Sequence, residues 1–91
     1  MVDEVNGYLL FKALGDQTRF KIVSILLGGE KCACVIPELV GRAQPTVSLQ
    51  LKYLVEVGIL SSRKDGKKIL YKIADKRIAK IIKLSKKGLK K

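Results

Sequence analysis

The sequence predicts a mainly helical fold with one small β-hairpin, in the order of a winged helix-turn-helix: four helices, two strands and a last helix. Two helical segments joined by a short turn at Gly41 indicate the helix-turn-helix, and Asp65-Gly66 between two strand-like segments indicates the hairpin. The net charge of +11 predicts a polyanionic partner, because such a surface attracts and steers polyanions. Double-stranded DNA fits all three observations.

The length of 91 residues favours one domain over residues 1–91 with one modest core. No apolar run reaches the length of a membrane span, and acidic residues precede the first apolar segment, where a signal peptide would be basic. We therefore expect a cytoplasmic protein without a membrane partner.

Helical periodicity predicts the first two helices. Gly15 should break the first helix after about Leu14, and Asp16 can cap the second, which is apolar over more than half its circumference and should be the central helix. Gly28-Gly29 should end it. The apolar stripe predicted for the first helix consists of Val2, Val5, Leu9 and Ala13.

Residues 32–54 should form a short third helix, a turn at Gly41 and a longer fourth helix that begins near Pro45. Val47, Leu51 and Leu54 share the face expected to point to the core. The opposite face is predicted to contact DNA, with a solvated helix face as the alternative. The predicted contacts are Gln44, Pro45, Thr46, Ser48, Leu49 and Lys52.

Residues 59–64 and 67–73 are expected to form the two strands of the hairpin, with the turn at Asp65-Gly66. The hairpin tip, or wing, concentrates positive charge that a purely structural hairpin does not need. The last helix should begin near Ala74-Asp75, and its apolar stripe can either form a dimer interface or dock on its own domain. The predicted DNA contacts of the wing are Arg63, Lys64, Lys67 and Lys68.

Cys32 and Cys34 are separated by one residue, so a disulfide between them would close a very small ring and constrain little of the unfolded chain. In a reducing cytosol they should remain thiols. The absence of His excludes a His general base, a Cys-His pair and any His-containing metal site, and no enzyme is expected. The two cysteines are either a soft-ligand site or small apolar residues at the start of the third helix.

Several motifs together resemble the ArsR/SmtB-type metal-sensing repressors. Residues 13–23 resemble the opening signature of that family, and residues 44–48 and 51–54 continue the match in the fourth helix. Residues 58–60, 65–67 and 70–71 continue it in the hairpin. The resemblance implies a homodimer on a palindromic operator, with an interface formed by residues 1–14 and 75–91 and with DNA affinity that drops when an inducer binds. The implied interface residues are Val2, Val5, Leu9, Ile78, Ile81, Ile82 and Leu89.

The Cys-x-Cys motif stands where the arsenic, cadmium and lead sensors of that family place theirs. A further cysteine of the arsenic sensors is replaced by Pro37, an arginine common in the fourth helix is replaced by Leu49, and of the acidic and His ligands on the last helix only Asp75 has a counterpart. A tight zinc or cadmium site is therefore disfavoured.

The resemblance leaves As(III) or Sb(III), bound by Cys32 and Cys34, as the expected inducer, and no resident cofactor is required. Because residues two apart point in opposite directions on an ideal helix, binding should unwind the first turn of the third helix. A response to thiol oxidation or to a non-metal signal is the alternative, and a small metal-carrier protein is less favoured.

Overall fold

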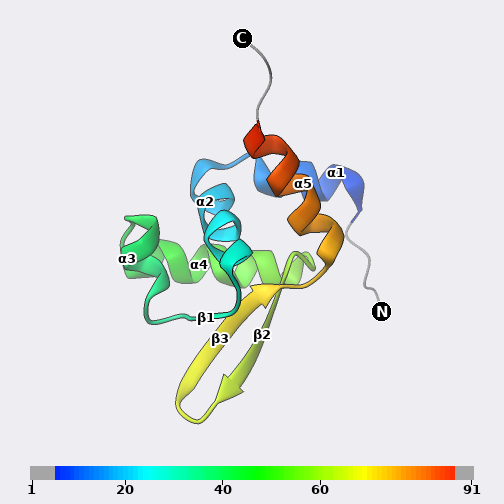
Figure 1. Cartoon of the computed structure of the whole chain (residues 1–91). Coiled ribbons are helices and arrows are strands. Elements are labelled where there is room, and N and C mark those ends of the chain that lie inside the picture. Colours follow the sequence, from blue (N-terminus) through cyan, green and yellow to red (C-terminus); the bar gives the residue numbers. More distant parts are fainter. Residues whose placement is uncertain (1–5, 88–91) are drawn as a thin grey trace.

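The computed structural model describes residues 6–87, in which helices form an upper body and a long hairpin projects away from it (Figure 1). Five α-helices, a short 3-10 helix and three strands follow the expected order, with one additional strand, β1. The elements are α1 (Gly7–Leu14), α2 (Gln17–Ile25), η1 (Leu26–Gly28), β1 (Lys31–Cys32), α3 (Ile36–Val40), α4 (Gln44–Glu56), β2 (Leu60–Asp65), β3 (Lys68–Ile73) and α5 (Lys76–Lys87).

Side-chain caps begin the first two helices. An Oδ1 atom of Asn6 accepts a hydrogen bond of 2.9 Å from the backbone N–H of Tyr8, and Asp16 Oδ2 accepts one of 3.0 Å from the N–H of Arg19. These bonds satisfy backbone donors that have no partner within the helix. The predicted cap at Asp16 is confirmed.

The core lies between the helices and the base of the hairpin, and α2 contributes Ile22 and Val23, both fully buried. The predicted inner face of α4 is confirmed, since Val47, Leu51 and Leu54 are all at most 3 % exposed.

On α1 the stripe that packs on the core differs from the predicted apolar stripe at Leu9, which was also predicted to lie in a dimer interface. Leu10, Ala13 and Leu14 are the buried residues, whereas Leu9 is 37 % exposed. Leu10, Ala13 and Leu14 also follow helical spacing, and this is the stripe that faces the core. Val2 and Val5 lie outside the described residues.

The last helix docks on its own domain through Ile78 and Ile82, which are 3 % and 0 % exposed. The expectation that these two side chains form a dimer surface is therefore corrected, because a buried side chain cannot contact a second chain. Ile81 is half-buried against the same core, and Leu89 lies outside the described residues.

Asp75 begins the helix by accepting a hydrogen bond from the backbone N–H of Arg77, and the hydrogen bonds from the Arg77 guanidinium lower the pKa of Asp75 to about 2.

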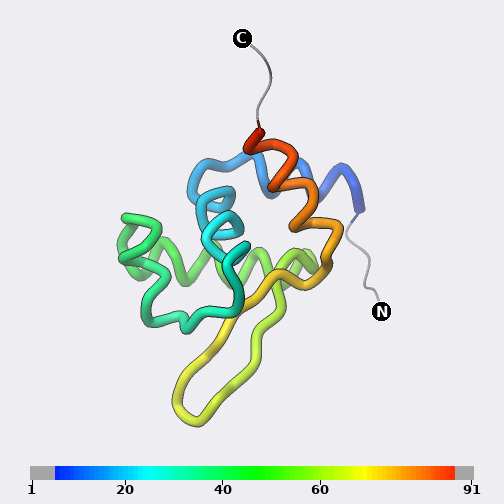
Figure 2. The backbone as a smooth tube through the Cα atoms, viewed as in Figure 1, coloured from blue at the N-terminus to red at the C-terminus, as the bar shows by residue number. Residues whose placement is uncertain are grey.

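The sheet has the order β1-β3-β2 and is antiparallel throughout. The hairpin pairs Leu60 with Ile73 at its base and Asp65 with Lys68 at its tip. Its two-residue loop is Gly66-Lys67, one position later than predicted, and Gly66 supplies the positive φ of 65° that the loop requires. The tube in Figure 2 shows that the hairpin reaches well beyond the helices.

Candidate nucleic-acid interface and cysteine site

The turn between α3 and α4 has the geometry expected of a helix-turn-helix. Gly41 ends α3 with φ of 77°, and its N–H and that of Arg42 both donate to the carbonyl of Pro37, at 2.8 and 3.2 Å. This is the left-handed helix end for which glycine is preferred. Pro45 then lies in the first turn of α4, as predicted.

The outer face of α4 is free in the single chain. All six predicted contact residues of this helix are exposed, and Leu49 is exposed to 67 % although it is apolar. A large apolar side chain on an otherwise polar helix face fits contact with a thymine methyl group in the major groove.

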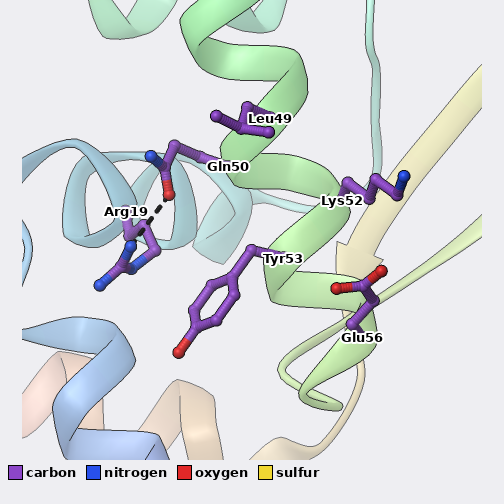
Figure 3. A pocket seen from close by; sticks show the side chains of 6 residues that line it. All are labelled: Arg19, Leu49, Gln50, Lys52, Tyr53 and Glu56. Atoms are coloured by element: carbon purple, nitrogen blue, oxygen red, sulfur yellow. Dashed lines mark hydrogen bonds between the residues drawn. The ribbon is translucent and has the colours of Figure 1, made fainter.

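Arg19 of α2 fastens α4 to the rest of the fold and was not predicted to have this role. Its Nε donates to the carbonyl of Ala13 at 2.8 Å, an Nη donates to Gln50 Oε1 at 3.0 Å, and the guanidinium carbon lies 4.6 Å from the centroid of the Tyr53 ring. Figure 3 shows Arg19 reaching from α2 toward Gln50 and Tyr53 on α4. A charged residue within an apolar helix was the only signal of this role in the sequence.

The wing residues divide into two groups. Lys64, Lys67 and Lys68 are exposed, as predicted. Arg63 is engaged, because its Nε and an Nη each donate to the carboxylate of Glu30 at 2.9 Å. This bidentate pair lowers the pKa of Glu30 and raises the pKa of Arg63, in both cases mainly through the side-chain hydrogen bonds.

The cysteines precede α3 and do not begin it, which corrects the prediction. Cys32 belongs to β1 and Cys34 to the turn that follows, while α3 starts at Ile36. Pairing with β3 holds this segment extended. The two sulfurs therefore come together without any helix unwinding, so that part of the predicted mechanism is wrong.

The structure joins Cys32 and Cys34 in a disulfide, with their Cα atoms 5.1 Å apart, where thiols were expected. The N–H of Cys34 also donates to Cys32 Sγ at 3.1 Å. Cys34 is exposed and Cys32 is half-buried, so the pair lies at the protein surface. A surface disulfide of this kind can exchange with thiols, and the two thiols released by its reduction can bind a soft ion.

A groove of about 390 Å³ brings the cysteine pair, α4 and the wing together. From α4 it receives Gln44 and Ser48, and from the wing it receives Lys67 and Lys68. Four residues predicted to contact DNA therefore line the same groove as both cysteines. Within residues 6–87 no three Cys, His, Asp or Glu side chains cluster as a metal site, so the two sulfurs have no third protein ligand there.

No helix in the described part of the chain is both long and apolar enough to cross a bilayer. The helix-turn-helix, the charged wing and the free outer face of α4 define a winged helix-turn-helix regulatory protein. The chain belongs to the arsR family of bacterial regulatory proteins, whose model matches residues 16–62. This is a family of regulators and not of enzymes, as expected.

Two curated relatives share about two fifths of the aligned residues. A probable mercury resistance operon repressor from Streptomyces lividans is 41 % identical over 76 residues, which are 84 % of this chain and 61 % of that protein. An uncharacterized HTH-type transcriptional regulator from Methanocaldococcus jannaschii is 42 % identical over 76 residues, 82 % of this chain and 85 % of that protein. The chain thus spans only about three fifths of the mercury resistance relative.

The chain is also similar to two repressors named for metalloids and to a homodimeric DNA-binding domain. The arsenical resistance operon repressor of Staphylococcus aureus is 39 % identical over 64 residues, 70 % of this chain and 62 % of that protein. The AntR antimony-specific transcriptional repressor superposes with a TM-score of 0.79 at 27 % identity, covering 92 % of this chain and 82 % of that one. A homodimeric winged helix-turn-helix DNA-binding domain from Mycobacterium bovis superposes with a TM-score of 0.78 at 28 % identity. The match covers 85 % of this chain and 71 % of that one.

Proposed function

We propose that this protein is a transcriptional repressor that binds a palindromic operator as a homodimer and releases it when As(III) or Sb(III) binds Cys32 and Cys34. The groove that holds both sulfurs together with Gln44, Ser48 and the wing lysines is the observation that carries the proposal. A ligand at the sulfurs lies within the surface that would face DNA.

DNA binding follows from the arrangement of the exposed faces. With α4 in the major groove, Ser48 and Leu49 meet base edges, while Lys52 and the wing lysines neutralise phosphates on either side. The excess of 19 Lys and Arg over 8 Asp and Glu supplies the long-range attraction.

A homodimer gives the exposed apolar residues of the terminal helices a partner. Tyr8 and Phe11 of α1 are 71 % and 64 % exposed, and Leu84 of α5 is 67 % exposed. Leu9 and Ile81 remain candidates for the same interface. The homodimeric neighbour from Mycobacterium bovis supports this assembly, and two reading helices related by a two-fold axis require a palindrome.

The cysteine chemistry favours a soft, three-coordinate metalloid. As(III) binds thiolates strongly. With the disulfide reduced to two thiols by a cellular thiol, Cys32 and Cys34 can each replace one hydroxide of As(OH)3, so that two As–S bonds form, two As–O bonds break and the thiol protons leave as water. Hydroxide, a small cellular thiol or a group from the second protomer would fill the third. The arsenical and antimony repressors among the similar proteins support this inducer class.

Thiol oxidation is the second candidate signal, and the disulfide itself favours it. Two thiols lose two electrons and two protons to an oxidant such as a cellular disulfide, which is reduced to two thiols. In this case the oxidised protein differs from the reduced protein in its DNA affinity.

The test is a titration of fully reduced protein on its promoter DNA with arsenite, antimonite, cadmium and zinc. Arsenite and antimonite should release the wild-type protein, and Cys32→Ser and Cys34→Ser should each abolish release while operator affinity stays nearly unchanged. Ser61→Ala is the matched control, because it removes a small polar side chain of β2 away from the groove lining. Retained release in both Cys variants would refute the site. A diamide arm, with the same variants, tests oxidation.

A further inference from the structure

The backbone of the Cys-x-Cys motif is part of the sheet that carries the wing. Cys32 pairs directly with Leu70 of β3, and the N–H of Ala33, the residue between the cysteines, donates to the carbonyl of Ile69 at 2.8 Å. Ile69 directly follows Lys68 at the wing tip. No intervening element separates the sulfurs from the wing strand.

A side-chain bridge joins the same two parts of the chain. Glu30 stands two residues before Cys32, and its carboxylate holds both donors of Arg63 on β2 at 2.9 Å. Arg63 pairs across the hairpin with Leu70, which pairs with Cys32, so one row of residues runs from the cysteine through β3 to Arg63. The segment before the cysteines is therefore fastened to both wing strands.

The link from the cysteines to α4 is of a different kind. The following helix, α3, is anchored by Ile36 and Val40, which are 0 % and 3 % exposed, and α4 is anchored by its own buried face. Close-packed interiors resist displacement. A small rearrangement at residues 32–34 thus meets a stiff core on the helical side. On the wing side the base of the hairpin packs on the same core, with Leu60 2 % exposed and Tyr71 partly buried, but residues 62–68 beyond it are exposed and are held by strand pairing and by the ion pair of Arg63 with Glu30.

We propose that the wing, and not the reading helix, is the element that the cysteine pair controls, with Glu30 and Ala33 as the positioning residues that connect them. The inference rests on the proposed function in one respect, that the state of the cysteines alters DNA binding. A ligand that bridges both sulfurs imposes its own geometry on the backbone of residues 32–34, and the bond from Ala33 to Ile69 changes with it. The ligand shifts the wing only as far as it prefers one geometry over the other.

Arg63 takes on a new role in this scheme. Its guanidinium is occupied by Glu30, so it serves as a tether and not as a phosphate contact, in contrast with Lys67. Removing a phosphate contact lowers the salt dependence of DNA binding by about one unit, and removing a tether does not.

The experiment measures the operator Kd of the 91-residue chain with and without arsenite, over a range of salt concentrations. The variants are Glu30→Gln, Arg63→Gln and the exchanged pair Glu30→Arg with Arg63→Glu, and Lys67→Ala is the control. Both single variants should retain the salt slope of wild type and show a several-fold smaller release by arsenite, and the exchanged pair should restore release. A salt slope reduced in Arg63→Gln as in Lys67→Ala, or unchanged release in Glu30→Gln, would overturn the proposal.

Hydrogen exchange on the free protein separates this inference from the proposed function. Wing amides in residues 61–73 should change their protection between the dithiol, disulfide and arsenite-treated forms, while those of residues 46–54 stay constant. Equal protection of the wing in the dithiol and disulfide forms, or a change confined to residues 46–54, would overturn the coupling. If arsenite leaves wild type on DNA, the proposed function fails, and the comparison of dithiol with disulfide still decides the coupling.

Discussion

The helix α4 and the wing carry the residues of the proposed DNA interface, and they are held in place by different means. The buried face of α4 consists of side chains at most 3 % exposed, with Arg19 bound across its outer edge. Residues 62–68 of the wing are all exposed. The position of α4 is thus set by the core. The hairpin is anchored in the core at its base, through Leu60, and its exposed part is held by strand pairing and by one ion pair with Glu30.

This difference separates the two tasks of a regulated DNA-binding protein. Each fully buried Leu or Val contributes about 1.5–3 kcal/mol to stability, so the position of α4 is costly to change. An exposed ion pair contributes little, so the wing can move at a small cost. In the proposed scheme, α4, which is costly to displace, recognises the operator, and the wing, which is cheaper to displace, changes its position.

The largest expected effect comes from the buried face of α4. Leu54 is 0 % exposed, so Leu54→Ala should lower the free energy of unfolding by about 2–5 kcal/mol, through lost burial and a cavity. Leu49→Ala, on the exposed face of the same helix, should change it by less than about 0.5 kcal/mol. Chemical denaturation at equal protein concentration measures both, and equal losses would contradict the assignment of the two faces.

A smaller loss in the free energy of unfolding is expected from a change at the start of α2, because α2 supports α4 through Arg19. Asp16→Ala removes the side-chain oxygen that accepts the N–H of Arg19 and should cost roughly 0.5–2 kcal/mol. Asp16→Asn keeps an acceptor at the same place and should recover most of the stability in the same denaturation measurement. A loss of equal size in both variants would show that the charge matters and not the cap.

On the wing the expected effect is on DNA and not on stability. Lys67→Ala should weaken binding to all sequences alike and lower the salt slope by about one unit, while the unfolding free energy changes by less than about 0.5 kcal/mol. Leu49→Ala should instead alter the preference among operator variants at nearly constant salt slope. Binding titrations at several salt concentrations distinguish the two variants. A loss of affinity in Lys67→Ala that depends on the operator sequence would contradict the assignment of Lys67 to the phosphates.

The smallest effect concerns pH. The hydrogen bonds from Arg63 hold the pKa of Glu30 below its ordinary value of 4.5. A depressed carboxyl pKa contributes stability above the unfolded-state pKa, and this is lost as pH falls through the folded-state pKa. The wing attachment should therefore be constant between about pH 6 and 8 and weaken only in acid. The carboxyl carbon shift of Glu30 should titrate below 4.5 in wild type and at a higher pH in Arg63→Gln.

Local patterns were sufficient for most elements of this fold. Gly41, Pro45 and the spacing of Val47, Leu51 and Leu54 predicted the helix-turn-helix correctly, because a glycine helix end and a helical stripe are properties of a short segment. The hairpin was found in the right place and its loop only one residue off, since both Asp65 and Gly66 favour turns. The exposed outer face of α4 followed directly from the buried one.

Non-local contacts decided the rest. The strand β1 has two residues, too few to show a period, and exists because β3 offers it an edge. This pairing keeps Cys32 and Cys34 out of the helix in which they were expected and places them against the wing. Helical spacing gives apolar stripes but not their partners, so only the packed structure could assign Leu10 and not Leu9 to the core, and Ile78 and Ile82 to their own domain. The sequence by itself thus determined which segments form helices and strands and which residues carry charge and sulfur. The tertiary structure determined which of these residues come into contact, because side-chain burial and strand pairing depend on residues far apart in the chain.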